Sequence, residues 1–203
     1  MSAAKPFLIT GMPMTGTAWL SAFLTTGTSI VYHEPLGRLG NLDEIADLYR
    51  SNFYKFVGVS DTGIGLFLDW MMEHVRPRTV ILDRPIEEIE SELGKIGLAR
   101  TNYLELLHDS LMKHRSNPEV LVVPYEATHN KRGAEKIYWH LCPGEAFDEV
   151  RFAEFLRYRI EIDIVSNAKI AIERWNVYGD LLKDIVPKLR AKEIHHAQPL
   201  PLR

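Results

Sequence analysis

The chain has few of the residues that build a covalent or metal framework. Cys142 is the one cysteine among 203 residues, which excludes a disulfide within the chain and a cysteine-based zinc site. A lone cysteine suits a reducing compartment, so we expect a cytoplasmic protein. The eight histidines show no His-Glu-x-x-His or other tight ligand spacing, so we expect no metal.

Long apolar runs and an excess of basic charge are also missing. No apolar run approaches the roughly 20 residues of a membrane-spanning helix, and Thr10 and Gly11 interrupt the first apolar segment, so no signal peptide is predicted. The 24 Lys and Arg residues against 27 Asp and Glu give a net charge of −3, which disfavours an extended nucleic-acid track. We expect no nucleic-acid partner and no membrane span.

The remaining composition is that of a globular domain, with 46% hydrophobic and 25% charged residues. Short apolar runs alternate with longer amphipathic segments, which predicts βαβ crossovers and a parallel sheet covered on both faces. The predicted strands are 7–10, 29–32, 56–59, 79–82 and 119–123. The predicted helices are 18–25, 42–49, 64–75, 85–93, 103–114, 131–140, 148–164, 166–176 and 180–191.

A glycine-rich turn, residues 11–20, follows the first predicted strand and opens a helix. Successive backbone N–H groups and a helix N-terminus hold phosphate or sulfate in this geometry. The spacing of Gly11 and Gly16 matches the start of a nucleotide-triphosphate P-loop, but Thr17 and Ala18 replace the Lys and Ser/Thr that should follow. An ATPase or GTPase is therefore disfavoured, and a plain strand–turn–helix connection stays open as the alternative.

These features predict an α/β protein with a three-layer P-loop-type fold, a five-stranded parallel sheet and a helical C-terminal extension. We expect one domain over residues 1–203, with a core at about 6–145, an extension at about 146–191 and a loose tail at 192–203. The apolar faces of the C-terminal helices have three alternative uses: covering the sheet, forming an acceptor lid, or supplying a homodimer surface.

The turn resembles the 5′-phosphosulfate loop of sulfotransferases, which reads approximately Pro-Lys/Arg-Ser-Gly-Thr-Thr-Trp-Leu. The chain has Pro13-Met14-Thr15-Gly16-Thr17-Ala18-Trp19-Leu20. Three further segments match in order: His33-Glu34-Pro35, then Asp83-Arg84-Pro85 with Ser91 in the next helix, then Leu121-Val122-Val123-Pro124-Tyr125-Glu126. The resemblance covers roughly residues 6–160.

The resemblance implies an enzyme that transfers a sulfuryl group from 3′-phosphoadenylyl sulfate (PAPS) to a hydroxyl or amine, on a small-molecule or glycan acceptor. The product would be 3′-phosphoadenosine 5′-phosphate (PAP), and no metal is expected. The loop residues that would hold the 5′-phosphosulfate are Pro13, Met14, Thr15, Gly16, Thr17 and Ala18.

Four residues outside the phosphate cradle match nucleotide-binding positions of the family. Trp19 would stack on adenine, or else is a core residue of the first helix. Arg84 and Ser91 would hold the 3′-phosphate, because a guanidinium meets phosphate oxygens in two hydrogen bonds, or else Arg84 pairs with a glutamate one turn along. Tyr125 would approach the adenine, or else is a half-buried tyrosine at a strand end.

Sulfuryl transfer needs a base to accept the proton of the acceptor. We prefer Glu34, with His33 as its competitor, and expect from strand alternation that the two side chains do not both face the cleft. The alternative for Glu34 is a carboxylate that caps a helix or pairs with Arg38. Asp61 is a secondary candidate, or else a turn residue before Gly63.

The loop lacks the cation that would stabilise the transferring group. Met14 occupies its position, and residues 6–37 contain no Lys or Arg. Either Lys55, Arg76 or Arg78 reaches the loop, or the protein binds the nucleotide with weak or no transferase activity. A non-catalytic nucleotide-binding or interaction protein is therefore the second hypothesis, and an atypical P-loop kinase is the third.

Overall fold

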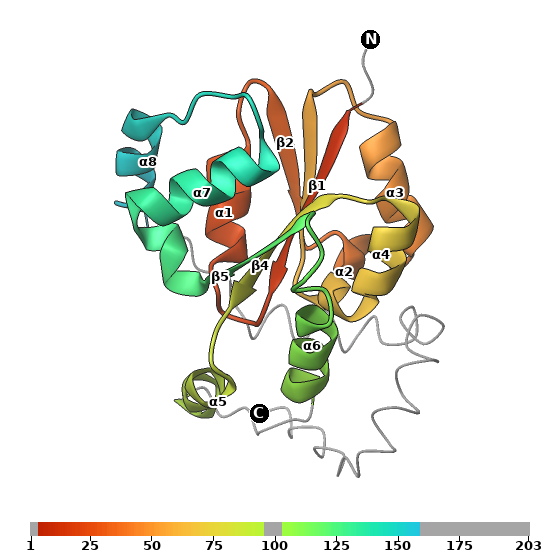
Figure 1. Cartoon of the computed structure of the whole chain (residues 1–203), viewed down its shortest axis with the longest axis vertical. Helices are drawn as coiled ribbons and strands as arrows, with labels where there is room; N and C mark the ends of the chain where they lie inside the picture. The colour runs from red at the N-terminus through yellow and green to blue at the C-terminus, as the bar shows by residue number, and fades with distance from the viewer. Residues whose placement is uncertain (1–3, 96–102, 159–203) are drawn as a thin grey trace.

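The computed structural model describes residues 4–95 and 103–158, and a five-stranded sheet forms the centre of this part (Figure 1). The strands lie in the order β2-β3-β1-β4-β5, and every neighbouring pair is parallel. Their bounds are β1 (Lys5–Gly11), β2 (Ser29–His33), β3 (Phe56–Ser60), β4 (Arg78–Asp83) and β5 (Val120–Pro124). The predicted α/β class and five-stranded parallel sheet are confirmed.

Helices cover both faces of the sheet and complete three layers (Figure 1). One face carries α1 (Thr17–Leu24), α7 (Lys131–Leu141) and α8 (Glu149–Phe155). The other carries α2 (Leu36–Leu39), α3 (Leu42–Arg50), α4 (Leu68–His74) and α6 (Tyr103–Met112). The short 3₁₀ helices η1 (Gly63–Phe67) and η2 (Tyr125–His129) follow β3 and β5.

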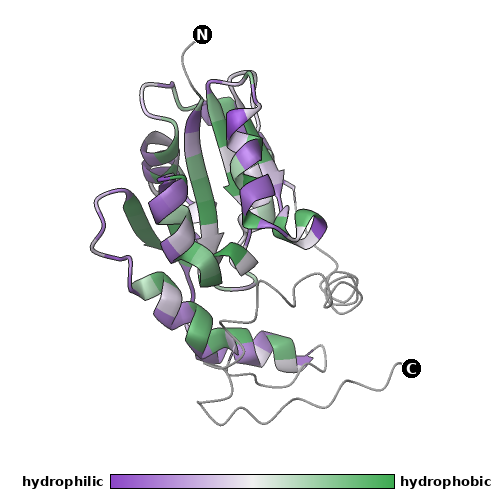
Figure 2. Ribbon diagram, turned by 90° about the vertical axis from the view of Figure 1, so that its right-hand side faces the viewer, coloured by the Kyte–Doolittle hydropathy of each residue, from purple (hydrophilic) through white to green (hydrophobic). Residues whose placement is uncertain are grey.

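The strands separate two hydrophobic cores because their side chains alternate between the faces. Phe7 and Ile9 point to the core under α1 and α7, whereas Leu8 points to the core under α3, α4 and α6. Figure 2 shows mainly hydrophobic strands, with hydrophilic stretches on the covering helices. This double coverage explains why the strand sequences are apolar at nearly every position.

The carboxyl ends of the strands are where a ligand-binding site is expected. The parallel strands all finish at the same edge, and α5 (Ile86–Lys95) and α6 lie beyond it in Figure 1. Open α/β sheets bind ligands outside the carboxyl ends of their strands. The segments that follow β1, β2, β3, β4 and β5 therefore define the region to search.

Some predicted helices differ from the observed ones. The segment 64–75 begins as η1 and becomes α-helical only at Leu68. Within η1, Gly65 lies so close to α6 that an added Cβ would be 2.6 Å from the Cδ1 of Leu107. The four-residue helix α2 was not predicted. Of the segment 148–164 the structure describes α8, which ends at Phe155, and the helices predicted at 166–176 and 180–191 lie outside the described residues.

Among the described residues, no helix is both long enough and apolar enough to span a bilayer.

Candidate functional site

The turn after β1 forms a cradle of backbone N–H groups. Met14 and Gly16 take left-handed conformations, with φ of 61° and 88°. The first helical hydrogen bond of α1 runs from the N–H of Leu20 to the carbonyl of Gly16, at 3.0 Å. Within the described residues, no hydrogen bond joins the N–H groups of residues 16–19 to a protein acceptor. Free N–H groups in such a turn, at the positive end of a helix, fit a bound phosphate or sulfate.

Close contact between the turn and β4 fixes the position of this cradle. A Cβ at Gly11 would lie 2.3 Å from the carbonyl oxygen of Leu82, so only glycine fits there. The N–H of Met12 donates to the same carbonyl at 3.1 Å, and the Thr15 hydroxyl donates to the carbonyl of Met12 at 2.7 Å. The turn is therefore held against the end of β4.

Arg84, immediately after β4, lies against the turn. Its Nη1 donates to the carbonyl of Met14 at 3.1 Å, and its guanidinium lies 4.6 Å from the ring centre of Tyr125. Its Nε also pairs with a carboxylate oxygen of Glu88 at 3.3 Å, as the alternative interpretation of Arg84 required. The structure thus brings three predicted site residues, Met14, Arg84 and Tyr125, into contact.

Ser91 is not part of this contact. It lies on an exposed part of α5, and within the described residues no hydrogen bond joins it to Arg84. Glu88, one turn before it on the helix, takes the position beside the guanidinium. The predicted pairing of Ser91 with Arg84 stays a prediction.

Trp19 packs in the core, which is the alternative that the sequence left open for it. Its side chain is buried, with its ring stacked on Phe23 at 5.2 Å between centroids and met edge-on by Phe152 and Phe155. Its indole N–H donates to the carbonyl of Phe155 at 3.0 Å. These contacts support the core alternative, and stacking of Trp19 on adenine stays a prediction.

His33 and Glu34 lie side by side, which contradicts the expectation from strand alternation. The Nε2 of His33 is 3.9 Å from the Oε1 of Glu34. Alternation holds only inside a regular strand, and β2 ends at His33. Glu34 takes a left-handed conformation with φ of 49°, which turns its side chain toward its neighbour.

Asp61, after β3, positions the backbone around Glu34. Its carboxylate accepts the N–H of Leu36 at 2.9 Å and the N–H of Ile64 at 3.2 Å, and the residue is buried. It therefore joins the starts of α2 and η1, the turn role that the sequence left open. Glu34 shares this role, because its carboxyl group also accepts a backbone hydrogen bond, from Thr62 at the start of η1. The secondary role of Asp61 as a proton acceptor stays a prediction.

Burial and neighbouring charge shift the titration of this group of residues. Burial first, and the Asp61 carboxylate second, raise the pKa of Glu34 to about 8, against an opposing backbone hydrogen bond from Thr62. Burial also raises the pKa of Asp61, and that of Tyr103 at the start of α6. Burial lowers the pKa of His33, with Arg38 adding to the effect. At neutral pH, the raised pKa of Glu34 favours its protonated form.

The comparisons with known proteins bear on the fold. No family model and no curated protein matches the chain. Among solved structures, the crystal structure of mouse sulfotransferase SULT7A1 complexed with PAP is similar, with a TM-score of 0.52 and 14% sequence identity over 77% of this chain and 64% of that one. The fold is that of a sulfotransferase. The chain spans less than two thirds of the length of this neighbour.

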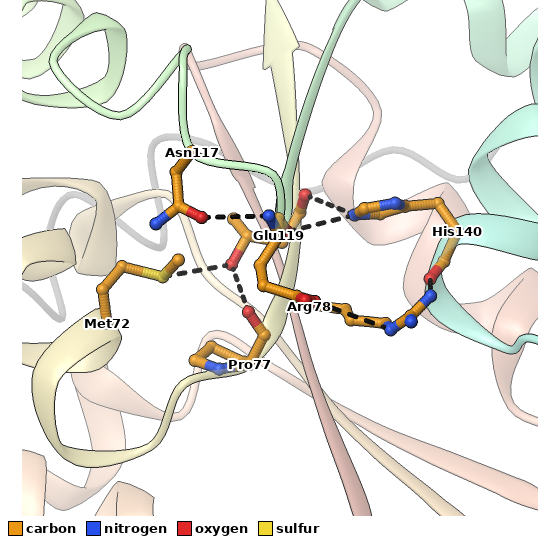
Figure 3. A network of polar contacts seen from close by, with 7 residues as sticks. Met72, Pro77, Arg78, Asn117, Glu119 and His140 are labelled. Atoms are coloured by element: carbon orange, nitrogen blue, oxygen red, sulfur yellow. Dashed lines mark hydrogen bonds and ion pairs between the residues drawn. The ribbon is translucent and has the colours of Figure 1, made fainter.

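The three basic residues that could have supplied a positive charge to the loop, Lys55, Arg76 and Arg78, lie at the other end of the sheet. Lys55 precedes β3 and pairs with Glu145 at 2.5 Å, at the amino ends of the strands. Arg76 precedes β4, and Arg78 is the first residue of β4. Figure 3 shows Arg78 beside His140, to whose carbonyl its Nη1 donates at 3.1 Å. The alternative in which one of the three reaches the loop is therefore not supported, because all three lie at the amino ends of the strands and the loop lies at the carboxyl ends.

Two residues next to the loop were missed by the sequence analysis. The hydroxyl of Thr128, in η2, would lie 3.6 Å from a Cβ added at Gly16, and it donates to the carbonyl of Tyr125 at 2.8 Å. Ser60 donates its hydroxyl to the carbonyl of Thr17 at 2.9 Å. Ser60 could have been predicted, because it is a polar residue at the end of an apolar strand. Thr128 could not, because only the tertiary fold brings it next to the loop.

A metal centre is not evident in the part of the chain that the structure describes, which contains no group of three or more His, Cys, Asp or Glu side chains able to hold an ion.

Proposed function

We propose that the protein binds PAPS at the carboxyl edge of the sheet and transfers its sulfuryl group to a hydroxyl or amine. One observation carries the proposal: in a sulfotransferase fold, the N–H groups of residues 16–19 have no protein acceptor within the described residues, and Arg84 contacts the same turn at Met14. The cradle fits an anionic group without a metal, because the donors are amides and a guanidinium.

The residues would divide the work along the sheet edge. The turn holds the 5′-phosphosulfate, and Tyr125 and Arg84 flank it from β5 and β4. Glu34, beyond β2, accepts the proton of the acceptor while the acceptor oxygen or nitrogen bonds to sulfur. The bond between sulfur and the bridging phosphate oxygen breaks, and its electrons leave with PAP. When bound, PAPS supplies the sulfuryl group.

The raised pKa of Glu34 determines when this base works. Only the ionised carboxylate accepts a proton, and burial together with Asp61 places its pKa at about 8 in the free protein. Transfer is therefore expected to accelerate as the pH rises toward 8.

Calorimetry and thermal unfolding with PAP, against ATP plus Mg²⁺, test the nucleotide specificity. We expect PAP to stabilise the protein, by about 2.7 kcal/mol at a free concentration of 100 times its Kd. Mg-ATP should give no comparable effect, because Thr17 and Ala18 replace the lysine and the Mg²⁺-binding hydroxyl. Stabilisation by Mg-ATP without stabilisation by PAP would reject the proposal and favour the kinase.

A nucleotide-binding protein without transferase activity is the second candidate. Met14 in place of the loop cation and the protonated state of Glu34 favour it. Release of PAP from PAPS in the presence of varied hydroxyl and amine acceptors separates the two candidates. Saturable PAP binding with no acceptor-dependent release at pH 8 would select the second.

The setting of the reaction is part of the proposal. Cys142 is buried and unpaired, as suits a reducing cytoplasm. The acceptor would be a small molecule or glycan that binds next to Glu34.

A further inference from the structure

We infer that Arg84 takes the place of the missing loop cation and contacts the 5′-phosphosulfate, rather than serving the 3′-phosphate alone. This assignment rests on the proposed function, because it presumes that the nucleotide occupies the turn. It changes the role that the family resemblance gave to Arg84, which was to hold the 3′-phosphate together with Ser91.

The first support is the position of the guanidinium. Its Nη1 donates to the carbonyl of Met14, the residue that stands at the position of the family cation. No other Lys or Arg side chain in the described part of the chain donates to residues 11–17. Arg84 thus brings a positive charge to the same point of the turn from a different strand.

The second support is that the arginine is held in place. Its side chain is 12% exposed, stacked on Tyr125 and paired through Nε with Glu88. The Thr128 hydroxyl in turn holds the carbonyl of Tyr125. A guanidinium has five N–H donors, and the bonds to Met14 and Glu88 use two of them. Within the described residues, the remaining donors have no hydrogen-bond partner.

The third support is the charge on the α5 side of Arg84. A 3′-phosphate held by Arg84 and Ser91 would lie toward α5, where the Glu88 carboxylate is 3.3 Å from Nε. Phosphate and carboxylate repel each other at such range. The turn instead offers uncharged N–H donors beside the guanidinium. An anion bound to Arg84 is therefore more strongly attracted at the turn than on the side of α5.

A comparison of two nucleotides tests the assignment. PAP and 5′-AMP share the adenosine 5′-phosphate and differ only in the 3′-phosphate. Their affinities are measured by calorimetry at fixed salt for the wild type, Arg84→Met and Arg84→Lys. Arg115→Met, which removes an exposed arginine at the end of α6, is the matched control. Circular dichroism and thermal unfolding without ligand establish that each variant is folded.

We expect Arg84→Met to weaken PAP and 5′-AMP by the same factor, about 10- to 100-fold, and Arg84→Lys by less. A loss confined to PAP would overturn the inference, because Arg84 would then recognise the 3′-phosphate. Wild-type binding of PAP with none of 5′-AMP would overturn it too. If the wild type binds neither nucleotide, the proposed function itself fails. If Arg84→Met does not fold, the same comparison is made with Arg84→Lys. Equal losses of affinity for PAP and 5′-AMP then support the inference, and a loss confined to PAP overturns it.

Discussion

Glu34 combines a left-handed backbone with a carboxyl group that is hard to ionise. Burial and the nearby Asp61 raise its pKa from an ordinary 4.5 to about 8. Between these values the unfolded chain releases the proton and the folded protein keeps it, so folding becomes less favourable as the pH rises. The penalty is absent below the unfolded pKa and complete above the folded one. Asp61, also shifted upward, acts in the same direction.

Replacing Glu34 by glutamine is therefore expected to remove part of this pH dependence. Between pH 5 and pH 8, the Tm of Glu34→Gln should rise relative to that of the wild type, because the amide carries no charge to bury. Scanning calorimetry across this range checks the result. Glu44→Gln, on an exposed position of α3, is the control and should follow the wild type. Parallel curves for Glu34→Gln and the wild type would contradict the prediction.

The sequence predicted which residues follow the strands but not how their side chains are oriented. His33, Glu34, Asp61, Arg84 and Tyr125 each stand at or just beyond a strand end, as expected. Their orientations depend on backbone torsions and contacts that no periodicity encodes. The turn of Glu34 toward its neighbour and the bond from Arg84 to the loop are both of this kind.

At the scale of elements, α8 fastens the far end of α1, the helix whose amino end carries the loop. Arg151 of α8 donates to the carbonyls of Ala22, Phe23 and Thr25, at 3.0, 3.0 and 2.8 Å. These are among the last carbonyls of α1, which have no partner inside the helix. A cation there also complements the negative end of the helix dipole.

Removing this cap is expected to destabilise the protein. Arg151→Ala should lower the free energy of unfolding by about 1–3 kcal/mol, because it leaves three carbonyls without their charged donor. Urea unfolding measures the change. Arg157→Ala removes an exposed arginine just after the same helix and should cost less than about 0.5 kcal/mol. Equal losses in the two variants would show that the cap contributes no stability.

The elements most fully predicted are those whose apolar residues are almost continuous. Each of the five strands was placed within a few residues, because strands buried on both faces need apolar side chains throughout. The helix α2 was missed since it has a single turn and begins directly after Pro35. The η1 helix was missed because the closeness of Gly65 to α6 is a tertiary contact.

At the scale of the whole molecule, the sheet keeps structural and functional contacts at opposite edges. The carboxyl edge carries the turn, Arg84 and Glu34. At the amino edge, a polar network joins the starts of β4 and β5 to the end of α7 (Figure 3). There the Nε2 of His140 lies 3.1 Å from the carbonyl oxygens of both Thr79 and Glu119, so it donates to them as a shared N–H. Parallel topology produces this separation, because all strands run in the same direction.

The separation predicts that stability and nucleotide affinity respond to different substitutions. His140→Ala should lower the free energy of unfolding by about 1–3 kcal/mol, with a fall in Tm of about 2–4 °C for each kcal/mol, because the imidazole N–H shared by the carbonyls of Thr79 and Glu119 is lost. The Kd for PAP should stay within twofold, since the contacts of His140 lie at the other edge of the sheet. Lys136→Ala, exposed on the same helix, is the control. Thermal unfolding and calorimetry on one preparation give both quantities. A tenfold loss of PAP affinity in His140→Ala would mean that the two edges are coupled through β4, whose first residues contact His140 and whose end leads into Arg84.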